Sequence, residues 1–162
     1  MELQGSCHCK AVTFTVRSTA PTPFNRCYCG ICRKTAGAGG YAINIGADTA
    51  AMEVTGRAHL RVYRAQVADP ATGGTVESSC ERNFCGLCGS ALWAYDPRWP
   101  DNIYPHASAI DTDLPVPPHR WHMMLSSKAA WVTPDVAGGD RTFEEYPDES
   151  LAAWHDRFGP VG

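Results

Sequence analysis

The sequence predicts a mainly β domain of many short strands, with zinc knuckles at its turns and one C-terminal helix. Three observations predict this fold. Glycine and proline, 15 and 12 of 162 residues, recur along the whole chain, which favours short strands joined by turns. Several short runs alternate between apolar and polar residues, as half-buried strands do. Seven of the eight cysteines fall into clusters with metal-ligand spacing. The length fits one domain, residues 1–162.

The clearest strand signal lies at residues 10–17, where Val12, Phe14 and Val16 fall on one face of an alternating run. Similar but shorter runs predict further strands at residues 41–45, 59–63, 75–78, 91–95, 107–110, 122–125 and 129–132. Residues 70–74 and 136–140 are rich in glycine and polar residues, which is typical of exposed loops.

Two segments break the strand pattern. Residues 30–36 show no alternation, so we expect a short helix or turn that begins inside a cysteine cluster. Residues 147–150 form a helix start signal, and Leu151, Trp154 and Phe158 follow at helical spacing. We expect this apolar stripe to pack in the core, and Gly159 and Pro160 to end the helix.

Composition and charge exclude some partners. The formal net charge of −3 and the pI of about 6.0, with no basic run, give no indication of a nucleic-acid partner. The first six residues are polar rather than an apolar leader, and no stretch is long enough to span a bilayer. We therefore expect a cytoplasmic protein without membrane contact, whose cysteines stay reduced. Four disulfides are the alternative, which the CxC spacing disfavours.

Two of the cysteine clusters complete each other. Cys7 and Cys9 form a CxC pair, and Cys85 and Cys88 form a CxxC pair followed by Gly-Ser. Four thiolates that converge from two backbone segments make a closed tetrahedral zinc site, and such sites stabilise folds. The two pairs therefore predict a structural zinc ion that ties the N-terminal strand to a late hairpin.

The remaining cluster is a triplet, Cys27, Cys29 and Cys32, and it predicts a second zinc ion with a different task. Three protein ligands leave one position for water or substrate, which is typical of a catalytic site. The alternative is a second closed site, completed by a distant residue. The candidates for that fourth ligand are His8, His106, His119, His122 and Cys80.

Charged residues flank the triplet, and one cysteine lies outside all clusters. Arg26, Arg33 and Lys34 could offset the negative charge of three thiolates or attract an anionic thiol, or could be solvated surface charges. Cys80 is expected to be a small packed side chain rather than a metal ligand.

The order and content of these motifs resemble a known family. The segments GSCHC at residues 5–9, CYCGICRKTAG at 27–37 and FCGLCGS at 84–90 are similar to those of the glutathione-dependent formaldehyde-activating enzymes, as is HMMLSSKAAW at 122–131. The resemblance implies an Mss4-like β-tent that binds two zinc ions. It implies that Cys7, Cys9, Cys85 and Cys88 hold the structural zinc, and that Cys27, Cys29 and Cys32 hold the catalytic one.

The resemblance also implies an activity. Formaldehyde and glutathione would condense to S-hydroxymethylglutathione, which is a carbon–sulfur lyase reaction run in reverse. Arg26, Arg33, Lys34 and Arg82 are candidates to bind the glutathione carboxylates. Two alternatives remain open: the same scaffold could act on another small electrophile, or it could be a non-catalytic, zinc-stabilised binding module.

Overall fold

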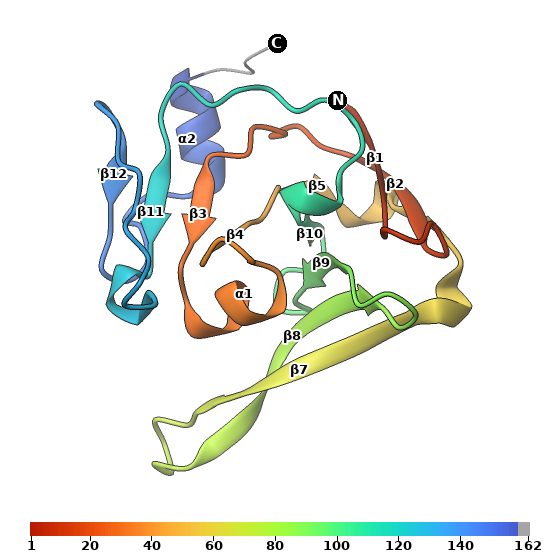
Figure 1. Cartoon of the computed structure of the whole chain (residues 1–162), viewed down its shortest axis with the longest axis horizontal. Helices are drawn as coiled ribbons and strands as arrows, with labels where there is room; N and C mark the ends of the chain where they lie inside the picture. The colour runs from red at the N-terminus through yellow and green to blue at the C-terminus, as the bar shows by residue number, and fades with distance from the viewer. Residues whose placement is uncertain (159–162) are drawn as a thin grey trace.

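The computed structural model of the chain describes residues 1–158 and contains three β-sheets, two α-helices and several short 3-10 turns (Figure 1). The predicted helix end at Gly159 and Pro160 lies outside these residues. Within the described part of the chain, no helix is long and apolar enough to cross a membrane.

The first sheet has the strand order β1-β2-β6, formed by β1 (Glu2–Ser6), β2 (Thr13–Arg17) and β6 (Glu53–Thr55). Strands β1 and β2 form an antiparallel hairpin in which Gly5 lies opposite Phe14. A Cβ atom on residue 5 would lie 2.2 Å from Cζ of Phe14, so this position requires glycine. The space is filled by the Phe14 ring, which packs edge-on against Trp93 in the main core.

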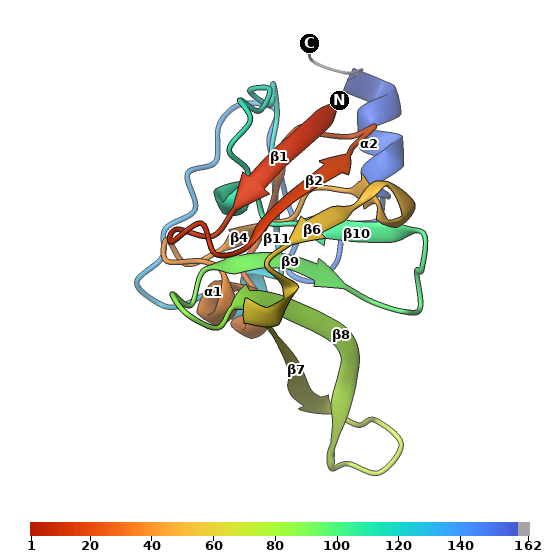
Figure 2. The ribbon, with the colours of Figure 1, turned by 90° about the vertical axis from the view of Figure 1, so that its right-hand side faces the viewer.

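The second sheet has the order β5-β10-β9-β8-β7. Its strands are β5 (Ala47–Asp48), β7 (Leu60–Ala68), β8 (Thr75–Cys85), β9 (Ala91–Tyr95) and β10 (Asn102–Pro105). Strands β7 and β8 are the longest, and their far ends project from the body as a two-stranded ribbon (Figures 1 and 2). The base of β8 pairs with β9 and ends at Cys85, so this sheet carries half of the first cysteine site.

The third sheet has the order β12-β11-β3-β4 and carries the triplet. Its strands are β3 (Asn25–Cys27), β4 (Ala42–Ile43), β11 (Trp121–Met123) and β12 (Arg141–Thr142). Strand β3 runs parallel to β11 and is followed at once by helix α1 (Gly30–Thr35). The late segment of the chain thus supports the loop that bears Cys27, Cys29 and Cys32.

Helix α2 (Leu151–Phe158) covers this third sheet, and its apolar stripe packs as the sequence predicts. Trp154 is fully buried and stacks on Phe24, with ring centroids 3.8 Å apart. The Ser150 side chain accepts a hydrogen bond of 3.1 Å from the Ala153 backbone N–H, which caps the first turn.

The mainly β fold and its C-terminal helix are confirmed, and several elements appear where the sequence places them. Strand β9 has the predicted bounds, β2 lies within residues 10–17, β4 lies within 41–45, and α1 lies within 30–36. Residues 60–63 of one predicted run and all of 75–78 are parts of longer strands, β7 and β8, and His59 ends the 3-10 turn before β7. The sequence did not reveal β1, β3, β5, β6, β10 and β12, most of which are short.

Three predicted strands are wrong in whole or in part. Residues 107–110 form the 3-10 turn η3 (Ala107–Ala109), because the Ala109 N–H bonds to the His106 carbonyl instead of to a neighbouring strand. Residues 129–132 form a turn in which Val132 is buried but Trp131 is exposed. Residues 122–125 leave β11 after Met123 and continue into η4 (Leu125–Ser127). Small residues and alternating polarity fit a tight turn as well as a strand.

The two other 3-10 turns, η1 (Thr49–Ala51) and η2 (Arg57–His59), connect the first two sheets. Residues 70–74 form the turn at the tip of the β7–β8 ribbon, as expected for an exposed loop. Residues 136–140 also form a loop, but the carboxylate of Asp140 at its end is buried.

Candidate metal centres

The four paired cysteines meet at one point, as the sequence predicts. Cys7 and Cys9 lie in the turn between β1 and β2, and Cys85 and Cys88 lie at the end of β8 and in the following turn. Their four sulfur atoms all lie within 4.8 Å of one another. The Cys7–Cys9 and Cys9–Cys85 sulfur separations are 3.6 and 3.8 Å. Zn–S bonds of about 2.3 Å in a tetrahedron require sulfurs about 3.8 Å apart, so the site fits a zinc ion.

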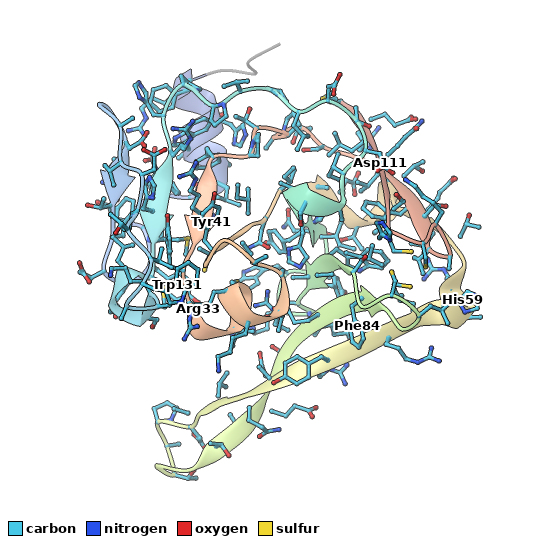
Figure 3. The ribbon with its side chains drawn as sticks, viewed as in Figure 1. Arg33, Tyr41, His59, Phe84, Asp111 and Trp131 are labelled. Carbon is cyan, nitrogen blue, oxygen red and sulfur yellow. The ribbon has the colours of Figure 1, made fainter. Side chains whose placement is uncertain are left out.

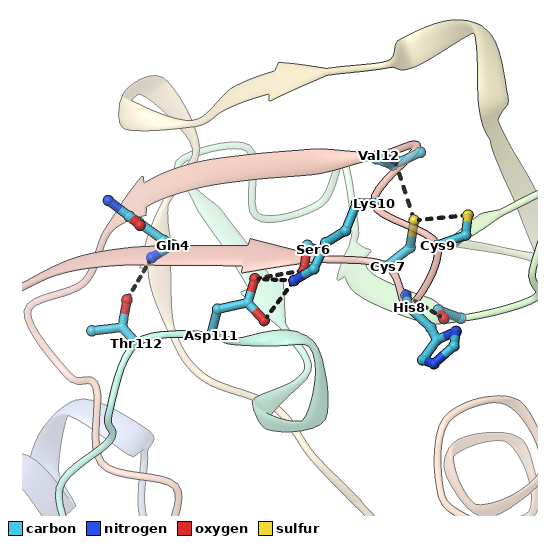
Figure 4. Close-up of polar contacts among 10 residues, drawn as sticks. Gln4, Ser6, Cys7, His8, Cys9, Lys10, Val12, Asp111 and Thr112 are labelled. Carbon is cyan, nitrogen blue, oxygen red and sulfur yellow. Dashed lines mark hydrogen bonds and ion pairs between the residues drawn. The ribbon is translucent and has the colours of Figure 1, made fainter.

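The backbone of each knuckle turns back on itself and directs N–H groups at sulfur or carbonyl oxygen. Val12 donates its N–H to Cys7 Sγ at 3.3 Å, as Figure 4 shows, and Lys10 adopts a left-handed conformation (φ 61°) to make the turn. In the second knuckle, Gly89 has φ 74° and donates to the Cys85 carbonyl. A hydrogen bond from the Ser90 hydroxyl lowers the pKa of Cys88 to about 5, which favours the thiolate that a metal binds.

A polar cluster on the surface supports the first knuckle (Figure 4). Lys10 Nζ donates to Ser6 Oγ at 2.6 Å and pairs with Asp111 at 3.3 Å, and Ser6 Oγ donates to Asp111 at 2.5 Å. These side chains are exposed, so the ion pair adds little stability by itself. The cluster holds the β1–β2 turn against the segment that follows η3.

The triplet forms a second, more buried cluster. Cys27 ends β3, Cys29 caps α1, and Cys32 lies in the first turn of α1, with all three sulfurs within 4.8 Å of one another. Cys27 and Cys32 are buried, whereas Cys29 is partly exposed. The Cys32 N–H donates to Cys29 Sγ at 3.3 Å. This backbone bond fixes the Cys29 sulfur at the start of the helix.

The three thiols interact strongly with one another. Hydrogen bonds from Cys27 and then Cys32 lower the pKa of Cys29, and the same interactions raise the pKa of Cys27. Cys29, the most exposed residue of the three, is thus the thiol that ionises most readily. Such a group of soft donors suits zinc or a similar thiophilic metal ion.

Among the described residues, no fourth histidine, cysteine or carboxylate ligand joins the triplet. The proposed closing residues lie elsewhere: His8 is exposed, His119 packs against Phe158, and Cys80 lies outside both clusters. His106 and His122 are buried and bound to other side chains. In the described part of the chain, none of these five residues joins the three thiols, so the structure gives no support to a site closed by one of them.

The sequence offered four basic residues near the cysteine clusters: Arg26, Arg33, Lys34 and Arg82. Of these, Arg82 contacts the triplet. Its Nη1 lies 3.6 Å from Cys32 Sγ, so the guanidinium can offset thiolate charge. Arg26 instead lies over the Tyr41 ring, at 5.0 Å from the centroid. Arg33 and Lys34 lie in the last turn of α1, and Figure 3 labels Arg33 next to this helix.

Behind the triplet lies a buried hydrogen-bonded chain that sequence analysis did not reveal. The Tyr28 hydroxyl lies 2.9 Å from His122 Nδ1, and His122 Nε2 lies 3.3 Å from Asp140 Oδ2. Burial lowers the pKa of His122, so the ring is neutral at neutral pH. A neutral ring that donates from Nε2 to Asp140 accepts from Tyr28 at Nδ1. Asp140 also accepts from the Arg120 N–H at 2.7 Å.

This chain positions the triplet loop, because Tyr28 lies between two of its cysteines. The Tyr28 N–H also donates to the Met123 carbonyl, so side chain and backbone are both tied to β11. His122 could be found from the family-like segment. Asp140, by contrast, comes from a loop whose sequence gives no sign of burial.

We expect Tyr28→Phe to destabilise the fold by about 1–3 kcal/mol, because the buried His122 Nδ1 loses its partner. Urea unfolding followed by circular dichroism measures this change. The matched control is Tyr41→Phe, whose ring lies beside Tyr28 and is partly exposed. Equal stability of the two variants would contradict the assigned network.

Comparison with known proteins agrees with the cysteine pattern. Residues 2–127 match the family described as "Glutathione-dependent formaldehyde-activating enzyme". A curated protein of Halomonas elongata named "Putative glutathione-dependent formaldehyde-activating enzyme" is 54% identical over 159 residues, which cover 98% of each chain. A crystal structure of a Rhodobacter sphaeroides protein, a structural-genomics target, superimposes with a TM-score of 0.50 at 20% identity. That alignment covers 86% of this chain and 98% of the other, and it supports the fold alone.

Proposed function

The chain belongs to the glutathione-dependent formaldehyde-activating enzyme family, and on that premise we propose that it is a zinc-dependent carbon–sulfur lyase. Its substrate would be a small thiol adduct such as S-hydroxymethylglutathione, formed from formaldehyde and glutathione. The observation that carries the proposal is the contrast between the two centres: one has four converging thiols and the other only three. We propose a cytoplasmic location, where glutathione is abundant and thiols stay reduced.

We propose that the two zinc ions have different tasks. Cys7, Cys9, Cys85 and Cys88 would hold a structural ion, because four thiolates complete a tetrahedron and leave no position for substrate. Cys27, Cys29 and Cys32 would hold the catalytic ion. When bound there, zinc supplies a site for a thiolate nucleophile and a Lewis acid for the aldehyde oxygen.

The chain's own residues prepare this site for bond formation. The thiolate sulfur of the substrate attacks the formaldehyde carbon, the C–S bond forms, and the carbonyl electron pair moves to oxygen, which takes up a proton. The reverse reaction removes that proton and breaks the C–S bond. Arg82 lies beside Cys32 and can stabilise negative charge on the incoming sulfur or on the oxygen. The Tyr28–His122–Asp140 chain holds the triplet loop in place.

Exchange NMR tests the proposal, since formaldehyde and glutathione also react without a catalyst. The metal-replete protein should accelerate exchange between free glutathione and S-hydroxymethylglutathione in proportion to its concentration. A folded protein with metal in both sites and no acceleration would overturn the proposal and would favour a binding module.

A further inference from the structure

A pocket of about 320 Å³ lies beside the triplet, between α1 and strands β7, β8 and β9. We call it the β8 pocket; the lining residues that matter here are Thr35, Tyr63, Arg82, Phe84, Ala91 and His106. Arg82 belongs to both sites, since it lines the pocket and its Nη1 lies 3.6 Å from Cys32 Sγ. Figure 3 labels Phe84 on β8. Arg82 therefore connects the triplet to the β8 pocket.

The charge of the walls indicates which half of a substrate enters. Among residues 1–158, Arg82 is the one charged side chain that lines the pocket. His106 adds no charge, because burial and the nearby Arg82 lower its pKa to about 4. Glutathione carries two carboxylates and an ammonium group, and unpaired charges are costly to bury. Arg82 can pair with one carboxylate at most, so the other carboxylate and the ammonium group would be left unpaired in the pocket. We therefore place the peptide half outside and the half derived from the aldehyde inside.

The polar groups of the pocket match a hydroxyl group. Asn44 Oδ1 lies 2.9 Å from His106 Nδ1, and an amide oxygen accepts only, so Nδ1 carries the hydrogen and Nε2 is an acceptor. Arg82 supplies donors only. A hydroxyl on the carbon next to sulfur can donate to His106 and accept from Arg82. A carbonyl oxygen or an alkyl group cannot do both.

The size of the pocket points to more than one carbon. The single carbon and oxygen from formaldehyde occupy little more than one or two water volumes of about 30 Å³ each, in a pocket of about 320 Å³. Phe84 and Ala91 would then face empty space or water. A longer carbon chain would cover these walls and gain from burial of apolar surface.

We propose that the β8 pocket binds the aldehyde-derived half of a thiohemiacetal, with its hydroxyl between Arg82 and His106 and a chain of several carbons against Phe84 and Ala91. This inference rests on the proposed function and names its substrate class as adducts of aldehydes larger than formaldehyde. Specificity then depends on the pocket walls, and the triplet supplies chemistry common to all aldehydes.

Calorimetric titration of the metal-replete protein with S-methylglutathione and S-butylglutathione tests this proposal without turnover. Each buried methylene should tighten binding about fourfold, so S-butylglutathione should bind roughly 50-fold more tightly. Ala91→Leu fills the pocket and should reduce this gain to less than about fivefold. The matched control Ala51→Leu, at a partly buried site in η1, should keep the full gain.

Equal affinity of the two ligands for the wild-type protein would overturn the proposal, as would a full gain in folded Ala91→Leu. If that variant does not fold, Tyr63→Ala removes a wall at a half-exposed position and should also reduce the gain. The outcomes separate the two proposals. Formaldehyde exchange without a chain-length gain overturns the pocket alone. A gain without formaldehyde exchange overturns the proposed function and leaves the β8 pocket as a binding site for the carbon chain.

Discussion

Replacing Cys29 with serine should abolish turnover and leave the protein folded. Cys29 supplies one of the three sulfurs of the triplet, so its loss leaves two sulfurs there. We expect kcat/KM for the formaldehyde–glutathione adduct to fall by at least about 1,000-fold, because the Lewis acid and the nucleophile site are lost together. Cys29 also caps α1, and serine is a preferred N-cap residue. The helix should therefore persist, and the thermal unfolding midpoint should change little.

Cys80→Ser is the matched control for this experiment. Cys80 is also a partly exposed cysteine, but it lies on β8 outside both clusters. Its replacement should change kcat/KM by less than about threefold. Full activity in Cys29→Ser would show that the triplet is not the reactive centre.

Cys85→Ser should unfold the protein rather than inactivate it selectively. Its sulfur is buried, and it joins β8 to the β1–β2 turn through the four-thiol centre. Structural zinc contributes about 10–16 kcal/mol to folding in zinc-finger peptides, whereas whole domains are stable by only about 5–15 kcal/mol. Loss of this ion should thus exceed the stability of the domain. Circular dichroism and soluble yield measure the effect.

Cys80→Ser serves here too, because it changes the same residue type on the same strand, five positions earlier. It should fold and retain metal. A Cys85→Ser protein that is soluble, cooperative in unfolding and as stable as the wild type would contradict a structural role for this centre.

Local signals explain which parts of the fold could be predicted. The β9 run, the α1 loop and the Leu151–Trp154–Phe158 stripe are set by neighbouring residues, so sequence spacing is enough to find them. Strands β3 and β12 are only three and two residues long. Both strands form by pairing with β11, which lies between them. Two or three residues are too few to show the alternation of apolar and polar residues that marks a strand.

The candidate site divides in the same way. Cysteine spacing identified every sulfur in both clusters, because metal ligands that share a short loop are close in sequence. Arg82 reaches the triplet across 50 positions of sequence, and Asp140 reaches Tyr28 through His122 from the far end of the chain. Such contacts depend on the packing of separate sheets. The β8 pocket likewise combines residues from α1 and three strands.

The most direct test of two centres with separate tasks is the number of zinc ions per chain. Native mass spectrometry under reducing conditions would compare the wild type with Cys29→Ser. Our account predicts two zinc ions in the wild type and one in the folded variant, with the four-thiol centre still filled. One zinc ion in both proteins would contradict it, because the triplet would then hold no metal.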